Sequence, residues 1–248
     1  AVGFSRDAHV RPSRPVRGFP VWLGQDGGHT PTTVLGQRID GRVRIIGALT
    51  SEHAGMRQHI ANLVRPWLGE FAPWVLEDRA LLHGRYDPSL NTDDQGDIDS
   101  NPLRILESEL RGMWQPGPIT WDGRKDPMLA LLNSMAGAEP VLQIDPTHAG
   151  LLVKALDTRW YYAQDIHGGL KKADTQSGSA QPKKPNHPWE DLGDAFAYLV
   201  AGIAPNKPVG AAGWQPESAH GVGFVPTAKS SSWRPRARGV GFDPLRLR

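Results

Sequence analysis

The sequence predicts an α/β fold, with a central mixed β-sheet flanked by helices. Three strand-like segments stand together near the start, at 21–25, 32–39 and 42–49, and short turns separate them. Behind them, several segments carry apolar residues at helical spacing, with one more strand candidate ending at Tyr86. A run of strands followed by helices and a further strand is typical of mixed α/β domains.

The composition is that of a loop-rich globular protein. The chain has 248 residues, with 28 Gly and 22 Pro, and is long enough for one large domain or two small ones. It contains no cysteine, which excludes disulfides and thiolate metal sites and fits a reducing compartment. No apolar window is long enough to cross a bilayer, and the start lacks a signal peptide, so we expect neither a membrane partner nor secretion.

The small net charge of +2 hides basic ends around an acidic body. Residues 1–20 carry four arginines and one acid, and residues 205–248 carry seven basic and two acidic residues. The body, 21–204, therefore has 17 basic and 23 acidic residues. Basic ends are often simply solvated, but they also suit a phosphate backbone or an acidic partner, while an acidic body is compatible with carboxylates that hold metal.

The segment 21–40 predicts a strand, a tight turn and a second strand. Its first apolar run ends at Asp26, and the two glycines that follow allow a sharp turn. The Asp40-Gly41 pair then predicts a type I′ hairpin into the third strand.

The later elements are predicted from apolar periodicity and from capping residues. We expect helices that open at Ser51, Asn101-Pro102, Asp126-Pro127 and Asp145-Pro146, with Met135 in the apolar stripe of the third, and short strands at 139–144 and 160–163. Residues 168–185 read as a surface loop, and a last helix capped by Asn186 carries its apolar stripe on Trp189, Leu192, Phe196, Leu199 and Ile203.

Three aspartates lie on different predicted elements, at positions from which they could form one catalytic site. Asp26 follows the first strand, Asp87 follows the fourth, and Asp194 lies early in the final helix. A β-β-β-α-β-α order with acids at these places is the plan of RNase H-like nucleases. There, two Mg²⁺ or Mn²⁺ ions about 3.5–4 Å apart assist phosphodiester hydrolysis, and such hard ions prefer oxygen ligands.

Each acid also has an ordinary structural interpretation. Asp26 could cap a turn, and Asp87, before Pro88, could simply end a strand. Asp191 and Asp194, three residues apart, could form the exposed face of an amphipathic helix. The functional interpretation comes from the order of the acids together.

Three segments resemble the C-terminal nuclease domain of tailed-phage large terminase subunits. They are LGQDGGHTPTTVLGQRIDGRVRIIGAL, YDPSLNTDDQGDIDSNPLRILE and KPNHPWEDLGDAFAYL. In that family the first segment runs Asp-x-Gly-x-Thr-Pro into a strand, the second has Asp-Pro, and the third has His-Pro before Asp-Ala. The resemblance covers roughly 15–205 in order and spacing.

The resemblance implies that Asp26, Asp87 and Asp194 are catalytic metal ligands for two Mg²⁺ or Mn²⁺ ions. Asp191, one helical turn earlier, is the rival for the third position. Many relatives have a further acid near the end of the third strand, where this chain has Ala48, with Glu52 four residues on.

The resemblance also offers candidates for DNA contact before the final helix. His187 could approach a phosphate or cap the helix, and we prefer the cap. The lysines of the preceding loop are either solvated or in contact with DNA; they are Lys171, Lys172, Lys183 and Lys184.

Family members place an ATPase motor before the nuclease domain, and this chain has no phosphate-cradling GxxxxGK[ST] loop. We therefore expect residues 1–20 to be a lead-in from an absent ATPase domain, 21–205 to be the nuclease domain, and 206–248 to be a mostly disordered basic tail. The implied function is metal-dependent cleavage of concatemeric viral DNA during genome packaging. The implied partners are double-stranded DNA, the capsid portal, the small terminase subunit and the ATPase domain, in the cytoplasm of an infected bacterium.

Two other functions remain open from the sequence. One is another RNase H-like nuclease of the resolvase or integrase type, which would cut branched DNA and leave plasmid nearly intact. The other is a non-catalytic docking module of a packaging motor, which would bind DNA or a portal without metal-dependent cleavage.

Overall fold

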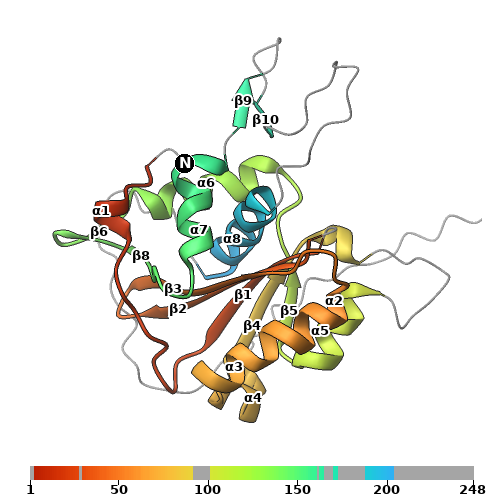
Figure 1. Ribbon diagram of the computed structural model, residues 1–248. Coiled ribbons are helices and arrows are strands. Elements are labelled where there is room, and N and C mark those ends of the chain that lie inside the picture. Colours follow the sequence, from red (N-terminus) through yellow and green to blue (C-terminus); the bar gives the residue numbers. More distant parts are fainter. Residues whose placement is uncertain are drawn as a thin grey trace, which may run out of the picture. The chain divides into compact units, whose positions relative to one another are not determined.

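The computed structural model describes residues 3–27, 30–91, 101–160, 162–164, 170–172 and 188–203, all within one unit, Ala1–Trp214. A six-stranded sheet lies between two layers of helices, and its strand order is β5-β4-β1-β2-β3-β8 (Figure 1). Its strands are β1 (Val21–Asp26), β2 (Thr32–Ile39), β3 (Arg42–Thr50), β4 (Leu82–Tyr86), β5 (Met113–Pro116) and β8 (Leu142–Ile144).

The sheet is mixed, as the sequence predicts. β1, β2 and β3 pair antiparallel through hairpins, while β4 and β5 continue parallel to β1 and β8 lies parallel to β3. At the β2–β3 turn, Asp40 has φ 48° and Gly41 has φ 77°. A type I′ turn requires positive φ at both positions, so the predicted hairpin is confirmed.

One face of the sheet is covered by helices from the middle of the sequence. They are α2 (Met56–His59), which continues through a π-helical segment (Ile60–Val64) into α3 (Arg65–Phe71), then α4 (Trp74–Glu77) and α5 (Pro102–Leu110). The prediction that the first helix begins at Ser51 is wrong. His53 has φ 56°, a left-handed conformation that a right-handed helix cannot include, and the Ser51 hydroxyl contacts a histidine ring instead.

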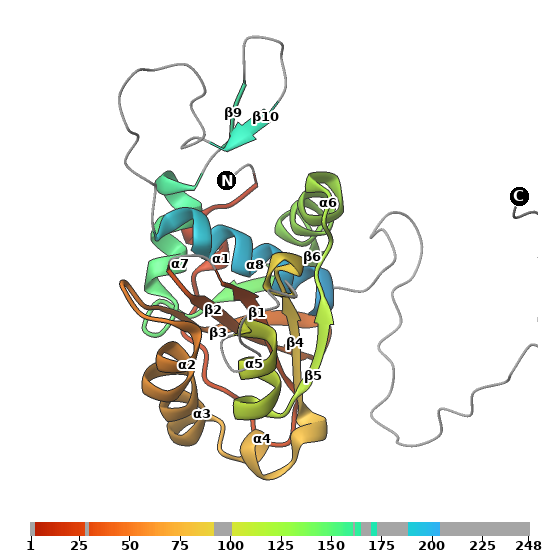
Figure 2. The same cartoon turned by 90° about the vertical axis from the view of Figure 1, so that its right-hand side faces the viewer.

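The other face is covered by α6 (Trp121–Leu132), by α7 (Gly150–Lys154) with the π-helical segment Ala155–Arg159, and by α8 (Trp189–Ile203). Figure 2 shows α6 and α8 on the opposite side of the sheet from α2–α5. Of the predicted apolar stripe of α8, Leu192, Phe196, Leu199 and Ile203 are buried, and Trp189 is partly buried against the same core.

Two further helix starts differ from the prediction. α6 begins at Trp121 because the Thr120 side chain accepts a hydrogen bond from Gly123 N, and Pro127 then lies inside the helix. Met135 is 57% exposed in β6 (Met135–Ala136) and does not belong to the apolar stripe. The helix expected from Asp145 begins at Gly150, after a turn in which Asp145 accepts from His148 N.

Several short elements escaped the sequence patterns. The expected surface loop 168–185 contains β10 (Leu170–Lys172), which pairs with β9 (Tyr162–Gln164). The other elements that the patterns did not indicate are α1 (Arg6–His9) and two 3₁₀ turns, Arg79–Leu81 and Pro88–Leu90, whereas β7 (Glu139–Pro140) and β8 lie within the predicted strand 139–144.

The described part of the lead-in packs against the sheet domain. Val10 forms a bridge with Ile144, and Arg11 N donates to Ile144 O at 3.1 Å. The buried His9 ring lies between Ser5 O and Leu132 O, at 3.0 Å from each. The Gln37 side chain binds the backbone of residues 16–19. The predicted tail, 206–248, lies outside the described residues.

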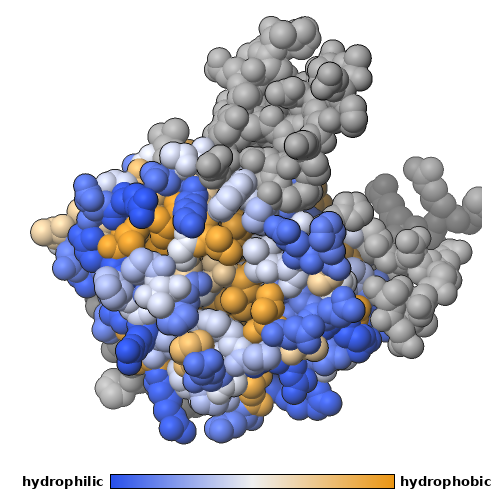
Figure 3. All heavy atoms as spheres, viewed as in Figure 1, coloured by the Kyte–Doolittle hydropathy of each residue, from blue (hydrophilic) through white to orange (hydrophobic). Residues whose placement is uncertain are grey.

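Each face of the sheet has its own apolar core. The α6–α8 side includes Val34, Ile45, Leu152 and Phe196, and the α2–α5 side includes Leu23, Leu35, Ile60 and Leu106. In the space-filling view of Figure 3, hydrophilic side chains cover most of the face shown, and apolar ones gather in small areas between them. Among the described residues, no helix is both long and apolar enough to span a bilayer.

Candidate metal centre

Asp26 and Asp87 are brought together at the carboxyl ends of neighbouring parallel strands. Asp26 is the last residue of β1, and Asp87 directly follows β4. The backbone N–H of Asp87 donates to Gln25 O at 2.9 Å, so the pairing of the two strands continues to the acids themselves. The ends of the first and fourth strands therefore lie side by side in the fold.

Both acids belong to the set of residues that faces α8. Alternate residues of β1 point to opposite faces, and Trp22 and Gly24 contact the α8 side, so Asp26 shares their face. On β4, Arg85 approaches α8 at Gly202, and two residues later Asp87 continues the same alternation. The opposite residues, Leu23 and Tyr86 among them, enter the core under α2–α5.

The backbone of α8 touches β1 at Gly24. A Cβ atom there would lie 1.9 Å from Ala195 O and 2.5 Å from Leu199 N, which only glycine avoids. Further along the helix, Gly202 lies against Trp22, near the start of the strand. The helix therefore runs antiparallel to β1, and its first turns lie toward the end of the strand that carries Asp26.

Asp191 and Asp194 occupy those first turns and are buried. Each is 5% exposed, so the interpretation of this pair as the solvated face of a helix is wrong. Asp26 is also buried, at 7% exposed. The ordinary interpretation of Asp87 is partly present, because its Oδ1 accepts from Ser89 N at 2.9 Å and caps the turn that follows.

Two residues that the sequence patterns did not single out lie beside these acids. Tyr198 is one helical turn after Asp194, and its hydroxyl accepts a hydrogen bond from Arg124 Nη1 of α6 at 3.2 Å. The same Nη1 atom lies 3.7 Å from Asp194 Oδ2. Spacing within α8 could have indicated Tyr198, but nothing in the sequence indicated that Arg124 of another helix would reach the acid.

The Tyr198 phenol lies within electrostatic reach of the three predicted ligands. Burial of the phenol raises its pKa well above the ordinary value, and the negative charges of Asp87, Asp194 and Asp26 raise it further, while Arg124 opposes them. The negative charges of all three predicted ligands therefore act on the phenol of Tyr198. The Tyr198 ring also packs on Gly117, whose N–H donates to Tyr86 O, the residue before Asp87.

A buried chain of hydrogen bonds lies on the other side of β1, under Asp26. Gln25 Nε2 donates to Asp26 O at 2.8 Å, which leaves Gln25 Oε1 to accept from the Thr33 hydroxyl. Thr33 has then used its proton, so it accepts from His59 Nε2 at 2.9 Å. His59 Nδ1 in turn accepts from the Ser51 hydroxyl at 2.8 Å.

Neutrality of the His59 ring is what leaves its Nδ1 atom able to accept from the Ser51 hydroxyl. Burial of the ring lowers its pKa to about 4, which agrees with that state at neutral pH. The chain of bonds connects α2 and the end of β3 to the last residues of β1. It therefore helps to hold the strand end from which Asp26 projects.

The structure says less about the roles of the remaining predicted site residues. Ala48 is buried in β3 and has no side-chain ligand to offer, while Glu52 is exposed after the strand. For Lys171 and Lys172 the structure describes the backbone, within β10. Lys183, Lys184 and His187, together with the cap residue Asn186, lie outside the described residues, so their roles stay predictions.

The donor chemistry around α8 suits a hard divalent cation. Asp26, Asp87 and Asp194 supply only carboxylate oxygens, which Mg²⁺ and Mn²⁺ prefer. In the part of the chain that the structure describes, however, no three His, Asp or Glu side chains are close enough to hold one ion. The residues fit such an ion by their chemistry, and Arg124 stands beside one of them.

No protein-family model matches the sequence, and no curated protein sequence matches it either. Structural comparison does find similar proteins. The large terminase from a thermophilic bacteriophage is 13% identical with a TM-score of 0.57, over 81% of this chain and 44% of that one. The P22 large terminase nuclease domain is 9% identical with a TM-score of 0.52, over 81% of this chain and 91% of that one.

A third structure, the large terminase nuclease from thermophilic phage G20c with bound magnesium, is 10% identical with a TM-score of 0.49, over 79% of this chain and 93% of that one. The fold assignment rests on the first two. This chain spans less than half the length of the first of these terminases. The domain has the RNase H-like fold of large terminase nuclease domains, as the sequence predicts.

Proposed function

We propose that this chain, which has the fold of large terminase nuclease domains, is a metal-dependent DNA endonuclease that cleaves concatemeric viral DNA during genome packaging. One observation carries the proposal. Asp26 and Asp87 end neighbouring parallel strands at the centre of the sheet, on the face where α8 supplies Asp191 and Asp194. A fold alone would not imply chemistry, but a set of carboxylates on rigid elements at one edge of a sheet does.

The proposed ligands are Asp26, Asp87 and Asp194. When bound there, two Mg²⁺ or Mn²⁺ ions would help water lose a proton, attack phosphorus and release the leaving oxygen. Asp26 and Asp87 hold their carboxylates on paired strands, and the close contact at Gly24 fixes α8 over them. Hydrolysis joins the water oxygen to phosphorus, breaks one phosphorus–oxygen bond and returns a proton to the leaving oxygen.

Asp194 is preferred over Asp191 as the third ligand. Asp194 lies one helical turn before Tyr198, and its charge acts on the Tyr198 phenol together with those of Asp26 and Asp87. Asp191 is equally buried and stays the alternative.

Binding of double-stranded DNA would depend mainly on phosphate contacts. The lysines before α8, Lys171, Lys172, Lys183 and Lys184, are the proposed contacts, with His187 as a further candidate. Because the body of the chain is acidic, we expect weak binding by the domain alone and a steep loss of affinity with salt. The portal, the small terminase subunit and an ATPase domain are the proposed partners, in the cytoplasm of an infected bacterium.

Cleavage of supercoiled plasmid with Mn²⁺ tests the proposal. Asp26→Asn and Asp87→Asn should each abolish cutting, as should EDTA in the unchanged protein, because each removes a ligand or the ion. Asp40→Asn is the matched control, since this exposed residue lies in the hairpin turn between β2 and β3 and asparagine tolerates its positive φ. Full activity in the first two variants, with circular dichroism unchanged, would reject the proposal.

The same preparations separate the two other functions. Rapid cutting of a four-way junction with little cutting of plasmid would favour a resolvase-type nuclease. Binding of DNA without any Mn²⁺-dependent cutting would favour a docking module.

A further inference from the structure

Arg124 is a buried cation held against a proposed metal ligand. Its side chain is 14% exposed, and its Nη1 atom lies 3.7 Å from Asp194 Oδ2. Arginine is rarely buried to this degree without a specific partner, because desolvation of its charge is costly. The position beside Asp194 is therefore built into the fold.

Aromatic side chains define where the guanidinium lies. Its centre is 5.4 Å from the Tyr198 ring centroid and 5.9 Å from that of Trp121, and Arg124 also donates to the Tyr198 hydroxyl. These contacts are individually modest. A divalent cation at Asp194 would lie within a few ångströms of the guanidinium, and like charges repel strongly at that distance in a poorly hydrated site.

We propose that Arg124 is a resident cation that neutralises Asp194 in the metal-free protein and is displaced when a divalent ion binds there. The inference rests on the proposed function and deepens it, because it makes Arg124 the residue that sets metal affinity at the third ligand. Arg124 acts through Asp194 and is therefore a positioning residue.

Mn²⁺ binding to the full chain, measured by titration calorimetry without DNA, tests the inference. Arg124→Gln should bind Mn²⁺ on the order of tenfold more tightly than the unchanged protein, because a competing charge a few ångströms away is removed. Lys125→Gln is the matched control, since it removes the same charge from the next residue, which pairs instead with Asp122 and Asp126. Its affinity should change by less than about twofold.

A double variant shows whether the effect passes through Asp194. In an Asp194→Asn background, Arg124→Gln should give no tightening, because the two residues are coupled. Tightening of equal size in that background, equal tightening in Lys125→Gln, or unchanged affinity in Arg124→Gln would each overturn the inference.

Tyr198→Phe covers the case in which Arg124→Gln does not fold. It removes the hydroxyl that accepts from Arg124 and keeps the ring, so Mn²⁺ should bind about two- to fivefold more tightly. Unchanged affinity would then overturn the inference.

Cleavage assays on the same samples separate this inference from the proposed function. If plasmid is cut in a manner dependent on Asp26 and Asp87, but Arg124→Gln leaves Mn²⁺ affinity unchanged, the nuclease stands and the inference is wrong. If Arg124→Gln tightens Mn²⁺ binding but no DNA is cut, the cation site stands and the nuclease proposal fails. If no variant binds Mn²⁺, both fail.

Discussion

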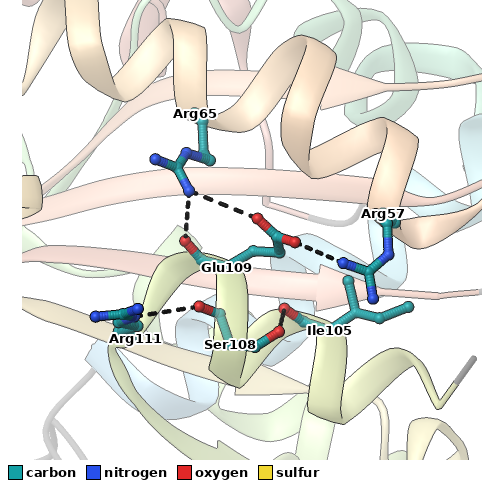
Figure 4. Close-up of polar contacts among 6 residues, drawn as sticks. All are labelled: Arg57, Arg65, Ile105, Ser108, Glu109 and Arg111. Atoms are coloured by element: carbon teal, nitrogen blue, oxygen red, sulfur yellow. Dashed lines mark hydrogen bonds and ion pairs between the residues drawn. The ribbon is translucent and has the colours of Figure 1, made fainter. Parts of the chain in front are cut away.

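Both faces of the sheet bury an apolar core, but charged side chains are buried on one face and exposed to solvent on the other. Under α6–α8, Asp191, Asp194 and Arg124 are largely removed from solvent. On the other side, Arg57 and Arg65 reach Glu109 across α2, α3 and α5 while staying in contact with water, at 53% and 51% exposed (Figure 4).

This difference distinguishes the proposed metal site under α8 from the exposed ion-pair cluster around Glu109. Exposed ion pairs such as Arg57–Glu109, at 2.7 Å, cost little to form and contribute little to stability. Buried carboxylates cost free energy that apolar residues in the same positions would avoid, and the proposed metal site would give those under α8 a use. The buried His59 on the α2–α5 face is instead held neutral within a chain of hydrogen bonds.

The largest effect that we expect concerns the two acids of α8. Asp194→Asn should lower Mn²⁺-dependent plasmid cutting on the order of a thousandfold, because it removes a charge at the reacting centre. Asp191→Asn should lower it less than about tenfold, because Asp194 is the proposed third ligand and Asp191 would act only as its buried neighbour one helical turn earlier. Initial rates at saturating Mn²⁺ measure both, and a reversed order would make Asp191 the third ligand.

The close contact between α8 and β1 makes Gly24 the next most sensitive position. Gly24→Ala should lower the free energy of unfolding by more than about 3 kcal/mol, because the new Cβ would collide with backbone atoms that cannot move independently. Urea unfolding followed by circular dichroism measures the loss. Gly69→Ala, in the exposed part of α3 with no atom within 4 Å of the new Cβ, should instead raise stability by about 0.5–1 kcal/mol. Similar losses in both variants would contradict the contact.

His59 should make the α2 face sensitive to acid. Its pKa falls from 6.5 in the unfolded chain to about 4 in the folded protein, so folding favours the neutral ring. The stabilisation is complete above pH 6.5 and is lost as pH falls from about 6.5 to about 4, by about 3 kcal/mol in total. The difference in unfolding free energy between the unchanged protein and His59→Gln, measured across this range, isolates the effect. A constant difference would contradict it.

The smallest effect should come from the surface cluster of Figure 4. Glu109→Gln removes the carboxylate that contacts Arg57 and Arg65, and it should change the free energy of unfolding by less than about 1 kcal/mol. The change should shrink further in 1 M salt, where charges at the surface are screened. A loss above about 2 kcal/mol would show that the two faces differ less in their electrostatics than the structure indicates.

Local patterns predicted the elements that depend on local forces. The three hairpin-linked strands, the strand ending before Asp87 and the helix capped by Asn101 are all present, because turn glycines, alternation and caps act over a few residues. Predictions failed where two local signals competed. At α6 the Thr120 cap prevailed over Asp126-Pro127, and after β3 the left-handed His53 delayed the helix start.

The sequence by itself indicated the three hairpin-linked strands, the positions of Asp26 and Asp87 after strands, and that of Asp194 early in the final helix, because periodicity and turn chemistry act locally. The tertiary structure alone decided that Asp191 and Asp194 are buried, that Gly24 lets α8 touch β1, and that Arg124 lies beside Asp194. Burial and ion pairing between α6 and α8 depend on packing between segments some seventy residues apart in the chain. No local pattern in the sequence encodes that packing.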